Sequence, residues 1–151
     1  MIQITTPFHY INPPHSLGFL FMGWWVVFDM AETQPWKMKI AIVGSRNYPD
    51  LDKVREFVRK LSPDDTIVSG GADCVDETAE DEARKLGLEV ISISPEWNKY
   101  GKTAGLIRND LIVATADCVV AFWDGVRRGT KYTIDKAREK NVITQIFNIV
   151  N

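Results

Sequence analysis

Histidine and cysteine are scarce in this sequence, and each shortage excludes a class of chemistry. The two histidines, His9 and His15, both precede residue 38, so the remainder of the chain contains none. We therefore expect neither histidine catalysis nor a metal site in that part of the protein. The two cysteines, Cys74 and Cys118, are too few for a disulfide framework and favour a protein of the reducing cytoplasm.

The standard motifs of nucleotide enzymes and serine hydrolases are also missing. No G-x-G-x-x-G follows the first apolar strand, and neither G-x-x-x-x-G-K-[ST] nor G-x-S-x-G occurs anywhere in the chain. These absences remove support for a dinucleotide dehydrogenase, a P-loop phosphatase or a serine-triad hydrolase.

The charge balance does not favour polyanionic partners. The chain has 18 Lys and Arg against 20 Asp and Glu, which gives a net charge of −2 and a pI near 5.7. Such a balance provides no overall attraction to nucleic acid or anionic membranes. We therefore predict that neither is a partner, although Arg127, Arg128 and Lys131 could form a local basic patch.

Residues 1–37 differ in pattern from the rest of the chain and contain an apolar run at 17–28, LGFLFMGWWVVF. The run is too short to span a bilayer comfortably, and no Lys or Arg precedes it. We interpret residues 1–37 as an amino-terminal extension, because Met30 resembles a natural start. An added strand or dimer-contact arm is the next alternative, followed by a segment that touches a membrane.

The pattern of residues 38–151 predicts one Rossmann-like domain. Short apolar segments alternate with amphipathic ones, which is typical of parallel strands that are covered by helices. We predict an α/β three-layer αβα sandwich around a mainly five-stranded parallel sheet. The expected strands are 39–43, 66–69, 88–93, 118–122 and 142–147. On the helix expected at 103–116, Ile107, Leu111 and Ala114 are predicted to face inward.

Special residues gather in the loops that follow the strands. In an open parallel sheet these loops share one rim, where ligands bind near the point at which the strand order reverses. The rim is therefore our candidate ligand-binding site. Its predicted residues are Gly44, Ser45, Arg46, Ser69, Gly70, Gly71, Ala72, Asp73, Asp76, Arg108, Asn109, Asp124, Gly125, Gly129 and Thr130.

Each rim feature also has a purely structural interpretation. The glycines could be tight turns, and Asp73 is typical of a helix N-cap. Arg108 sits early in its helix, where a cation is disfavoured unless it meets a ligand or an acid such as Asp110 or Asp124. The aromatic residues Trp97 and Tyr100 could stack on a base or simply cover the core. Four acids of the second helix are interpreted as a mostly solvated face: Glu77, Glu80, Asp81 and Glu82.

Four loop motifs occur in one order: GSR, SGGADCVD, PEWNKYGKTAGLIRN and ADCVVAFWDGVRRGT. Together they resemble the YspA-type branch of the SLOG superfamily, which includes the DprA/Smf DNA-processing proteins and the Lonely-Guy phosphoribohydrolases. The resemblance covers residues 39–140. It implies a pocket for a nucleotide or nucleotide-derived small molecule as the only expected cofactor-like ligand, and it implies a possible homodimer.

Two departures from that resemblance bear on function. Cys74 stands where relatives carry a glycine, and Thr133 stands where the Lonely-Guy enzymes carry a catalytic glutamate. We therefore expect a cytoplasmic nucleotide-binding sensor or carrier. The first alternative is a nucleotide hydrolase or phosphoribohydrolase that uses Arg108, Asp76 or Asp124, and the second is a DprA-like DNA-handling protein.

Overall fold

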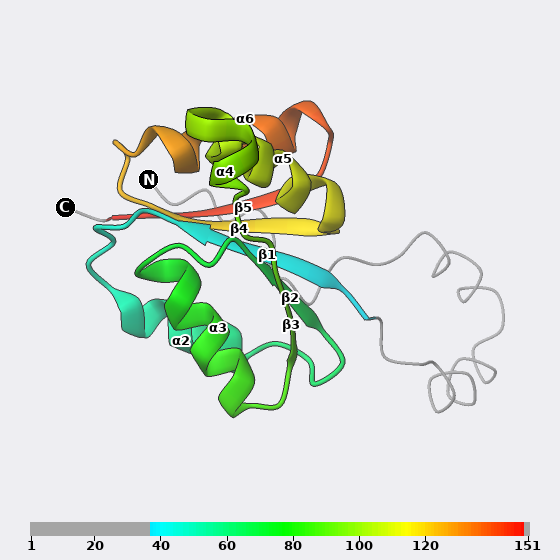
Figure 1. The fold of residues 1–151 in the computed structure, drawn as a ribbon. Helices are drawn as coiled ribbons and strands as arrows, with labels where there is room; N and C mark the ends of the chain where they lie inside the picture. Colours follow the sequence, from blue (N-terminus) through cyan, green and yellow to red (C-terminus); the bar gives the residue numbers. More distant parts are fainter. Residues whose placement is uncertain (1–36, 150–151) are drawn as a thin grey trace, which may run out of the picture.

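The computed structural model describes residues 37–149, so the predicted extension lies outside the described residues except for Lys37. The described part is an α/β fold in which strands and helices alternate along the chain, which confirms the predicted fold class (Figure 1). Its elements are β1 (Lys39–Gly44), α2 (Leu51–Arg59), β2 (Thr66–Ser69), α3 (Val75–Lys85), β3 (Glu89–Ser92), α4 (Trp97–Tyr100), η3 (Gly101–Thr103), α5 (Ala104–Thr115), β4 (Cys118–Trp123), α6 (Arg128–Glu139) and β5 (Ile143–Asn148).

The five strands form one parallel sheet in the order β3-β2-β1-β4-β5. The chain moves outward from β1 to β3 and then returns to the other side of β1 to form β4. The strand order therefore reverses between β1 and β4, where Ile42 lies opposite Val120 in the register. A sheet of this topology binds ligands beyond the carboxyl ends of the strands on either side of the reversal.

Two layers of helices cover the sheet, because alternate strand residues point to opposite faces. On one face, Val54 of α2 and Ala79 of α3 pack against Ile40 and Phe122. On the other face, Ile112 of α5 and Ile134 of α6 pack against the neighbouring strand positions. Figure 1 shows α2 and α3 below the sheet, with α5 and α6 above it. The core is thus divided into two halves by β1, β2 and β4.

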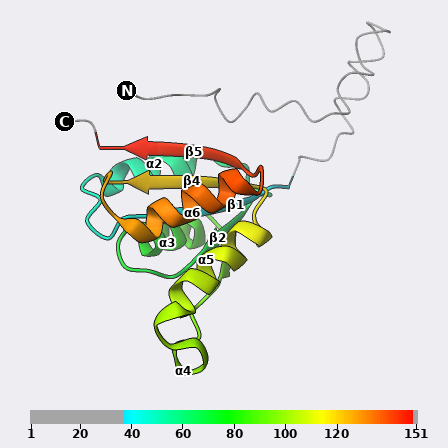
Figure 2. The ribbon, with the colours of Figure 1, turned by 90° about the horizontal axis from the view of Figure 1, so that it is seen from above.

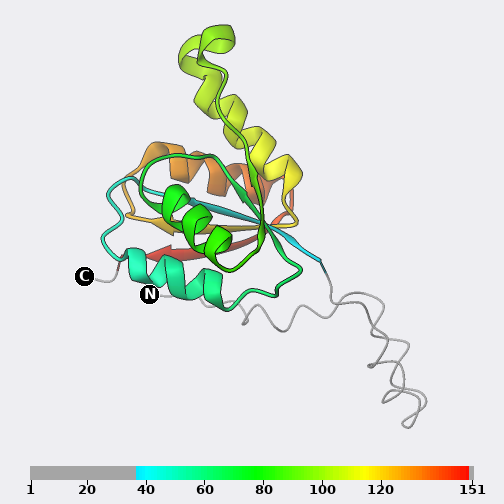
Figure 3. The same ribbon diagram turned by 60° about the horizontal axis from the view of Figure 1, so that its bottom comes forward.

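Helix α5 differs from the prediction in the face that it buries. Ile112 and Val113 are buried against the sheet, whereas Leu111 is 51% exposed and Ala114 is exposed. The prediction is wrong for Leu111 and Ala114, whereas Ile107 is half-buried. Apolar residues occur on more than one face of this helix, so periodicity could not select the buried face. Figures 2 and 3 show that the first turns of α5, together with α4, extend beyond the body of the sheet.

Candidate functional site at the carboxyl ends of the strands

The loops after β1, β2 and β4 meet at one rim, as the topology predicts. Ser45 is fully buried and accepts a hydrogen bond from the Asp124 backbone N–H at 3.2 Å, which joins the loops after β1 and β4. The side chain of Asn109 reaches the Gly129 carbonyl at 3.5 Å, which joins α5 to the start of α6. The structure therefore brings residues from distant parts of the sequence together around the reversal of strand order.

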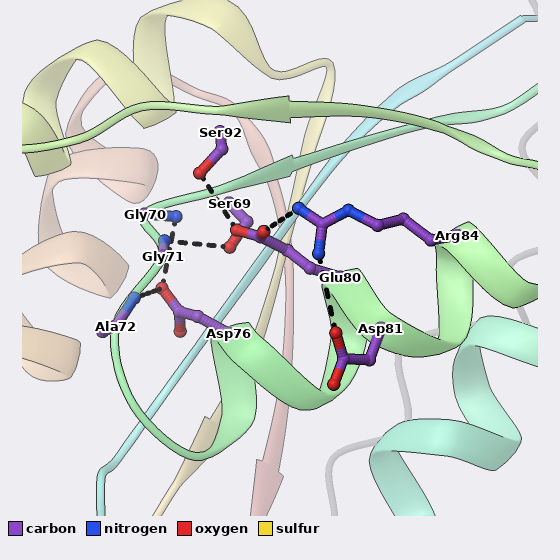
Figure 4. A network of polar contacts seen from close by, with 9 residues as sticks. All are labelled: Ser69, Gly70, Gly71, Ala72, Asp76, Glu80, Asp81, Arg84 and Ser92. Carbon is purple, nitrogen blue, oxygen red and sulfur yellow. Dashed lines mark hydrogen bonds and ion pairs between the residues drawn. The ribbon is translucent and has the colours of Figure 1, made fainter.

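The glycine loop after β2 is closed by a carboxylate from α3 (Figure 4). Asp76 accepts hydrogen bonds from the backbone N–H groups of Gly70 at 3.2 Å and Ala72 at 3.4 Å. The N–H of Gly71 donates to the Ser69 hydroxyl at 3.2 Å. Backbone N–H groups beside a helix N-terminus favour an anion, and here the protein supplies that anion itself. A phosphate at this rim must therefore use other donors.

Burial of Asp76 dominates its electrostatics. The side chain is 4% exposed, and this burial raises the pKa of Asp76 to about 6. The charge of Arg108 and the two backbone hydrogen bonds lower the pKa, whereas the nearby charge of Glu80 raises it further. Loss of hydration therefore outweighs the favourable partners, and the carboxyl changes charge near neutral pH.

Arg108 reaches from α5 to the same loop and donates to the Gly70 carbonyl. A side chain at Gly70 would displace the Arg108 guanidinium, because an added Cβ would lie 2.7 Å from the Arg108 Cζ. The Nε of Arg108 is buried and has no hydrogen-bond partner within residues 37–149. Burial lowers the pKa of Arg108, the charge of Asp76 raises it, and the nearby charge of Arg46 lowers it. Arg108 therefore keeps an unused donor beside a second cation.

The two acids proposed as structural partners of Arg108 have other partners. Asp110 accepts a hydrogen bond from the Tyr132 hydroxyl at 2.9 Å. Asp124 accepts from the N–H groups of Val126 at 3.0 Å and Arg127 at 2.8 Å, and so holds its own loop, in which Gly125 has a φ of 81°. Burial raises the pKa of Asp124, but these hydrogen bonds lower it by more.

The arginines of the rim differ from those of α2 and α3. Among the described residues, no ion pair involves the four rim arginines, which are Arg46, Arg108, Arg127 and Arg128. By contrast, Arg55 pairs with Asp52 in α2, and Arg84 pairs with Glu80 in α3. Lys131, which was predicted to extend the basic patch, pairs with Asp135 instead.

The first turn of α6 adds further donors. This helix has no side-chain cap, so the N–H groups of Gly129 and Thr130 have no acceptor within the helix. Gly129 is exposed, whereas Thr130 is 5% exposed. Thr133, at the position of the expected catalytic glutamate, is 1% exposed and donates to the Gly129 carbonyl at 3.1 Å. A hydroxyl here helps to fix the turn and provides no acid.

Two sequence interpretations at α3 are corrected by the structure. Asp73 is not the N-cap: Cys74 occupies that position without a side-chain hydrogen bond, and Asp73 is exposed. Glu80 and Glu82 are not solvated, since they are 6% and 5% exposed. They are buried because basic side chains compensate their charges: Arg84 meets Glu80 at 2.6 Å and Arg59 meets Glu82 at 2.6 Å.

Sequence reasoning also missed a residue that supports the glycine loop. Glu80 accepts a hydrogen bond from the Ser92 hydroxyl at 3.1 Å, which joins α3 to the end of β3 beside Gly71 (Figure 4). The spacing of Asp76, Glu80 and Arg84 at four-residue intervals was the available signal, because such residues share one face of a helix.

No cluster of three His, Cys, Asp or Glu side chains within residues 37–149 could hold a metal ion. Over the same range, no helix combines the length and the apolar character needed to cross a membrane.

Comparison with known proteins identifies the fold of the chain but does not assign the chain to a family. No family model and no curated protein matches the chain. Among solved structures, the chain is similar to DNA processing protein A (DprA) from Streptococcus pneumoniae, with a TM-score of 0.63 and 23% identity. It is also similar to DprA from Helicobacter pylori, with a TM-score of 0.54 and 22% identity. Each match covers 76% of this chain, but only 51% and 66% of the respective DprA chains.

These observations define a Rossmann-like α/β domain whose rim carries arginine side chains. DprA proteins are among the solved structures that share its fold. The prediction that nucleic acid is not a partner was wrong, because the Helicobacter pylori structure is reported for its single-stranded DNA binding mode. The prediction relied on the charge of the whole chain, which averages away the arginines gathered at the rim.

Proposed function

We propose that the rim of the sheet binds single-stranded DNA through its phosphate groups. The observation that carries the proposal is the set of four rim arginines, Arg46, Arg108, Arg127 and Arg128, which form no ion pair within residues 37–149. Arginine is suited to this task because its planar guanidinium presents several donors to phosphate oxygens.

The arrangement offers more than one contact along a strand. Arg46 and Arg108 lie near one another at the ends of β1 and β2, while Arg127 and Arg128 begin α6 beyond β4. The uncapped first turn of α6 contributes N–H groups and the positive end of the helix dipole. Successive phosphates of a flexible strand can therefore meet successive cations along the rim.

The comparisons support the same function at the level of the fold. The chain shares its architecture with DprA from Helicobacter pylori, a protein described by its binding of single-stranded DNA. From the four loop motifs we also infer that the chain belongs to the YspA-type branch of the SLOG superfamily. The likeness to DprA favours DNA handling, whereas the resemblance to the YspA-type branch implies a pocket for a nucleotide-derived small molecule, which is the second candidate ligand below.

Fluorescence anisotropy with a labelled single-stranded oligonucleotide tests the proposal on the full chain. Arg108→Gln removes one phosphate contact and is expected to weaken binding by about 1.5–3 kcal/mol, the value of a hydrogen bond to a charged group. Arg138→Gln is a matched control, because Arg138 is exposed, lies at the other end of α6 and forms no ion pair within the described range. Equal losses in both variants, or no binding by the wild-type protein, would contradict the proposal.

A second candidate ligand is a free nucleotide or nucleotide-derived small molecule. The observation that favours it is the buried Nε of Arg108, which has no partner among residues 37–149, since a recessed donor suits a single terminal phosphate better than a continuous strand. Competition by nucleoside monophosphates in the same anisotropy assay distinguishes the ligands. Displacement of the oligonucleotide at micromolar nucleotide would favour the small molecule, whereas displacement only by other strands would favour DNA.

A further inference from the structure

The short helix α4 carries aromatic side chains away from the core. Trp97 is 55% exposed and Tyr100 is 39% exposed, and no residue of α4 is buried. Figures 2 and 3 show α4 at the end of an extension formed with the first turns of α5. The alternative in which these aromatic residues cover the core is therefore excluded for α4.

The Trp97 indole is nevertheless held in place. It packs over Gly105 in the first turn of α5, where an added Cβ would lie 3.4 Å from the Trp97 Cη2. The ring therefore contacts the helix on one side while much of its surface stays in solvent. An exposed aromatic ring that is fixed on one side is a surface on which a planar group can stack.

This surface lies close to the proposed phosphate site. Gly105 and Arg108 are three residues apart in α5, and residues at this spacing are neighbours on one helix face, about 5–6 Å apart between Cβ positions. Arg108, whose guanidinium contacts Gly70, and Gly105, on which the indole rests, therefore lie on the same face of α5. A phosphate and the base of the same or the next nucleotide could meet the two side chains together.

The charge of the extension matches a nucleic acid. Residues 97–109 include three cations, Lys99, Lys102 and Arg108, and no acid. Lys99 pairs with Glu96 at 3.7 Å, so Lys102 and Arg108 are the cations of this segment that form no ion pair within residues 37–149. The Lys99 ammonium lies 4.8 Å above the Tyr100 ring, so one face of that ring is already occupied and Trp97 offers the better platform. Sequence-tolerant binding of single strands combines such cations with aromatic stacking.

We propose that Trp97 is a base-stacking platform for the single strand whose phosphate is held at Arg108. The inference rests on the proposed function and extends it from the phosphates to the bases. It assigns α4 and the first turn of α5 a role in binding rather than in folding, in agreement with the exposure of both aromatic residues.

The experiment compares two labelled strands of equal length on the full chain: oligothymidylate, and a strand in which every nucleotide is an abasic analogue. Both carry the same phosphates, so the abasic strand reports the arginine contacts alone. Trp97→Ala is expected to weaken binding of oligothymidylate by about 5-fold to 150-fold, the range for one stacked base, and to leave binding of the abasic strand unchanged. Trp97→Phe should restore most of the loss.

Leu106→Ala is the matched control, because Leu106 is a large apolar residue of the same extension and is 44% exposed. It should alter neither affinity. Equal weakening of both strands by Trp97→Ala, or no weakening of either, would overturn the stacking inference while wild-type binding to the abasic strand still supports the phosphate site. A wild-type dimer that Trp97→Ala converts to a monomer in gel filtration would also overturn it, since the platform would then be a contact between two copies.

Discussion

Substitution of Asp76 by asparagine should change how the free energy of unfolding depends on pH. The direction of the change shows whether burial, or the neighbouring charges and hydrogen bonds, dominate the pKa of this carboxyl group. In the native state, burial raises the pKa of Asp76 from 3.8 to about 6. The folded protein therefore binds the Asp76 proton more tightly than the unfolded chain does. It follows that the contribution of Asp76 to stability falls as pH rises from about 4 through 6, and that this loss is complete at about pH 7.

The size of this change in the free energy of unfolding follows from the same two pKa values of Asp76. A shift from 3.8 to about 6 corresponds to about 3 kcal/mol at 1.36 kcal/mol for each pKa unit. About 2 kcal/mol of this change falls between pH 4.5 and pH 7.5, a range that is accessible to measurement. The amide of the Asp76→Asn variant would have no charge to bury, and its carbonyl can still accept hydrogen bonds from the N–H groups of Gly70 and Ala72.

Urea denaturation of Asp76→Asn and wild type between pH 4.5 and pH 7.5 measures this difference. The free energy of unfolding of the variant minus that of the wild type should rise by about 2 kcal/mol across the range, because all other titrating groups are shared. A difference that falls as pH rises would refute the reasoning. It would mean that Arg108 and the backbone hydrogen bonds outweigh burial and stabilise the ionised carboxylate.

Four further substitutions test the local structure by thermal or urea denaturation. Cys74→Gly should stabilise the protein by about 1 kcal/mol, because Cys74 has a φ of 76°, and an unchanged or lower midpoint would show that the cysteine is not strained. Gly44→Ala should destabilise it by about 1–3 kcal/mol, since the new Cβ would lie 2.5 Å from the Val75 Cβ; a neutral result would mean that α3 can move away from β1. Leu111→Gln should change the free energy of unfolding by less than about 0.5 kcal/mol, whereas Ile112→Ala should lower it by about 2–5 kcal/mol. A larger loss for Leu111→Gln than for Ile112→Ala would mean that the face predicted from the sequence is the buried one.

The fold was predictable because its pattern is dictated by burial on both faces of a parallel sheet. The segment 66–69 of the prediction coincides with β2, and the other strands differ by a residue or two at their ends. The apolar stripes of α2 and α3 were informative, since Val54, Val58, Ala79 and Ala83 are all buried, although α3 also buries Glu80 and Glu82. Helix α5 was placed correctly in the sequence but turned wrongly, because its exposed Leu111 is as apolar as its buried Ile112.

The site was less predictable, because it depends on where the chain turns back on itself. The sequence indicates that Gly70 and Asp76 lie near one rim, but only the folded loop shows that the carboxylate accepts the glycine N–H and so occupies the place of an anion. Likewise, the burial of Glu80 depends on Arg84 and Ser92, which come from a helix and the next strand. Charge compensation of this kind is a three-dimensional property that composition does not report.

The most direct test of a phosphate-binding rim is the salt dependence of single-strand affinity. If the four rim arginines each neutralise one phosphate, a plot of log K against log salt should have a slope of about −3, from about −0.7 for each contact on a single strand. The double variant Arg46→Gln, Arg108→Gln should reduce the slope to about −1.4. A wild-type slope near zero, or one that the double variant leaves unchanged, would contradict a phosphate-binding rim.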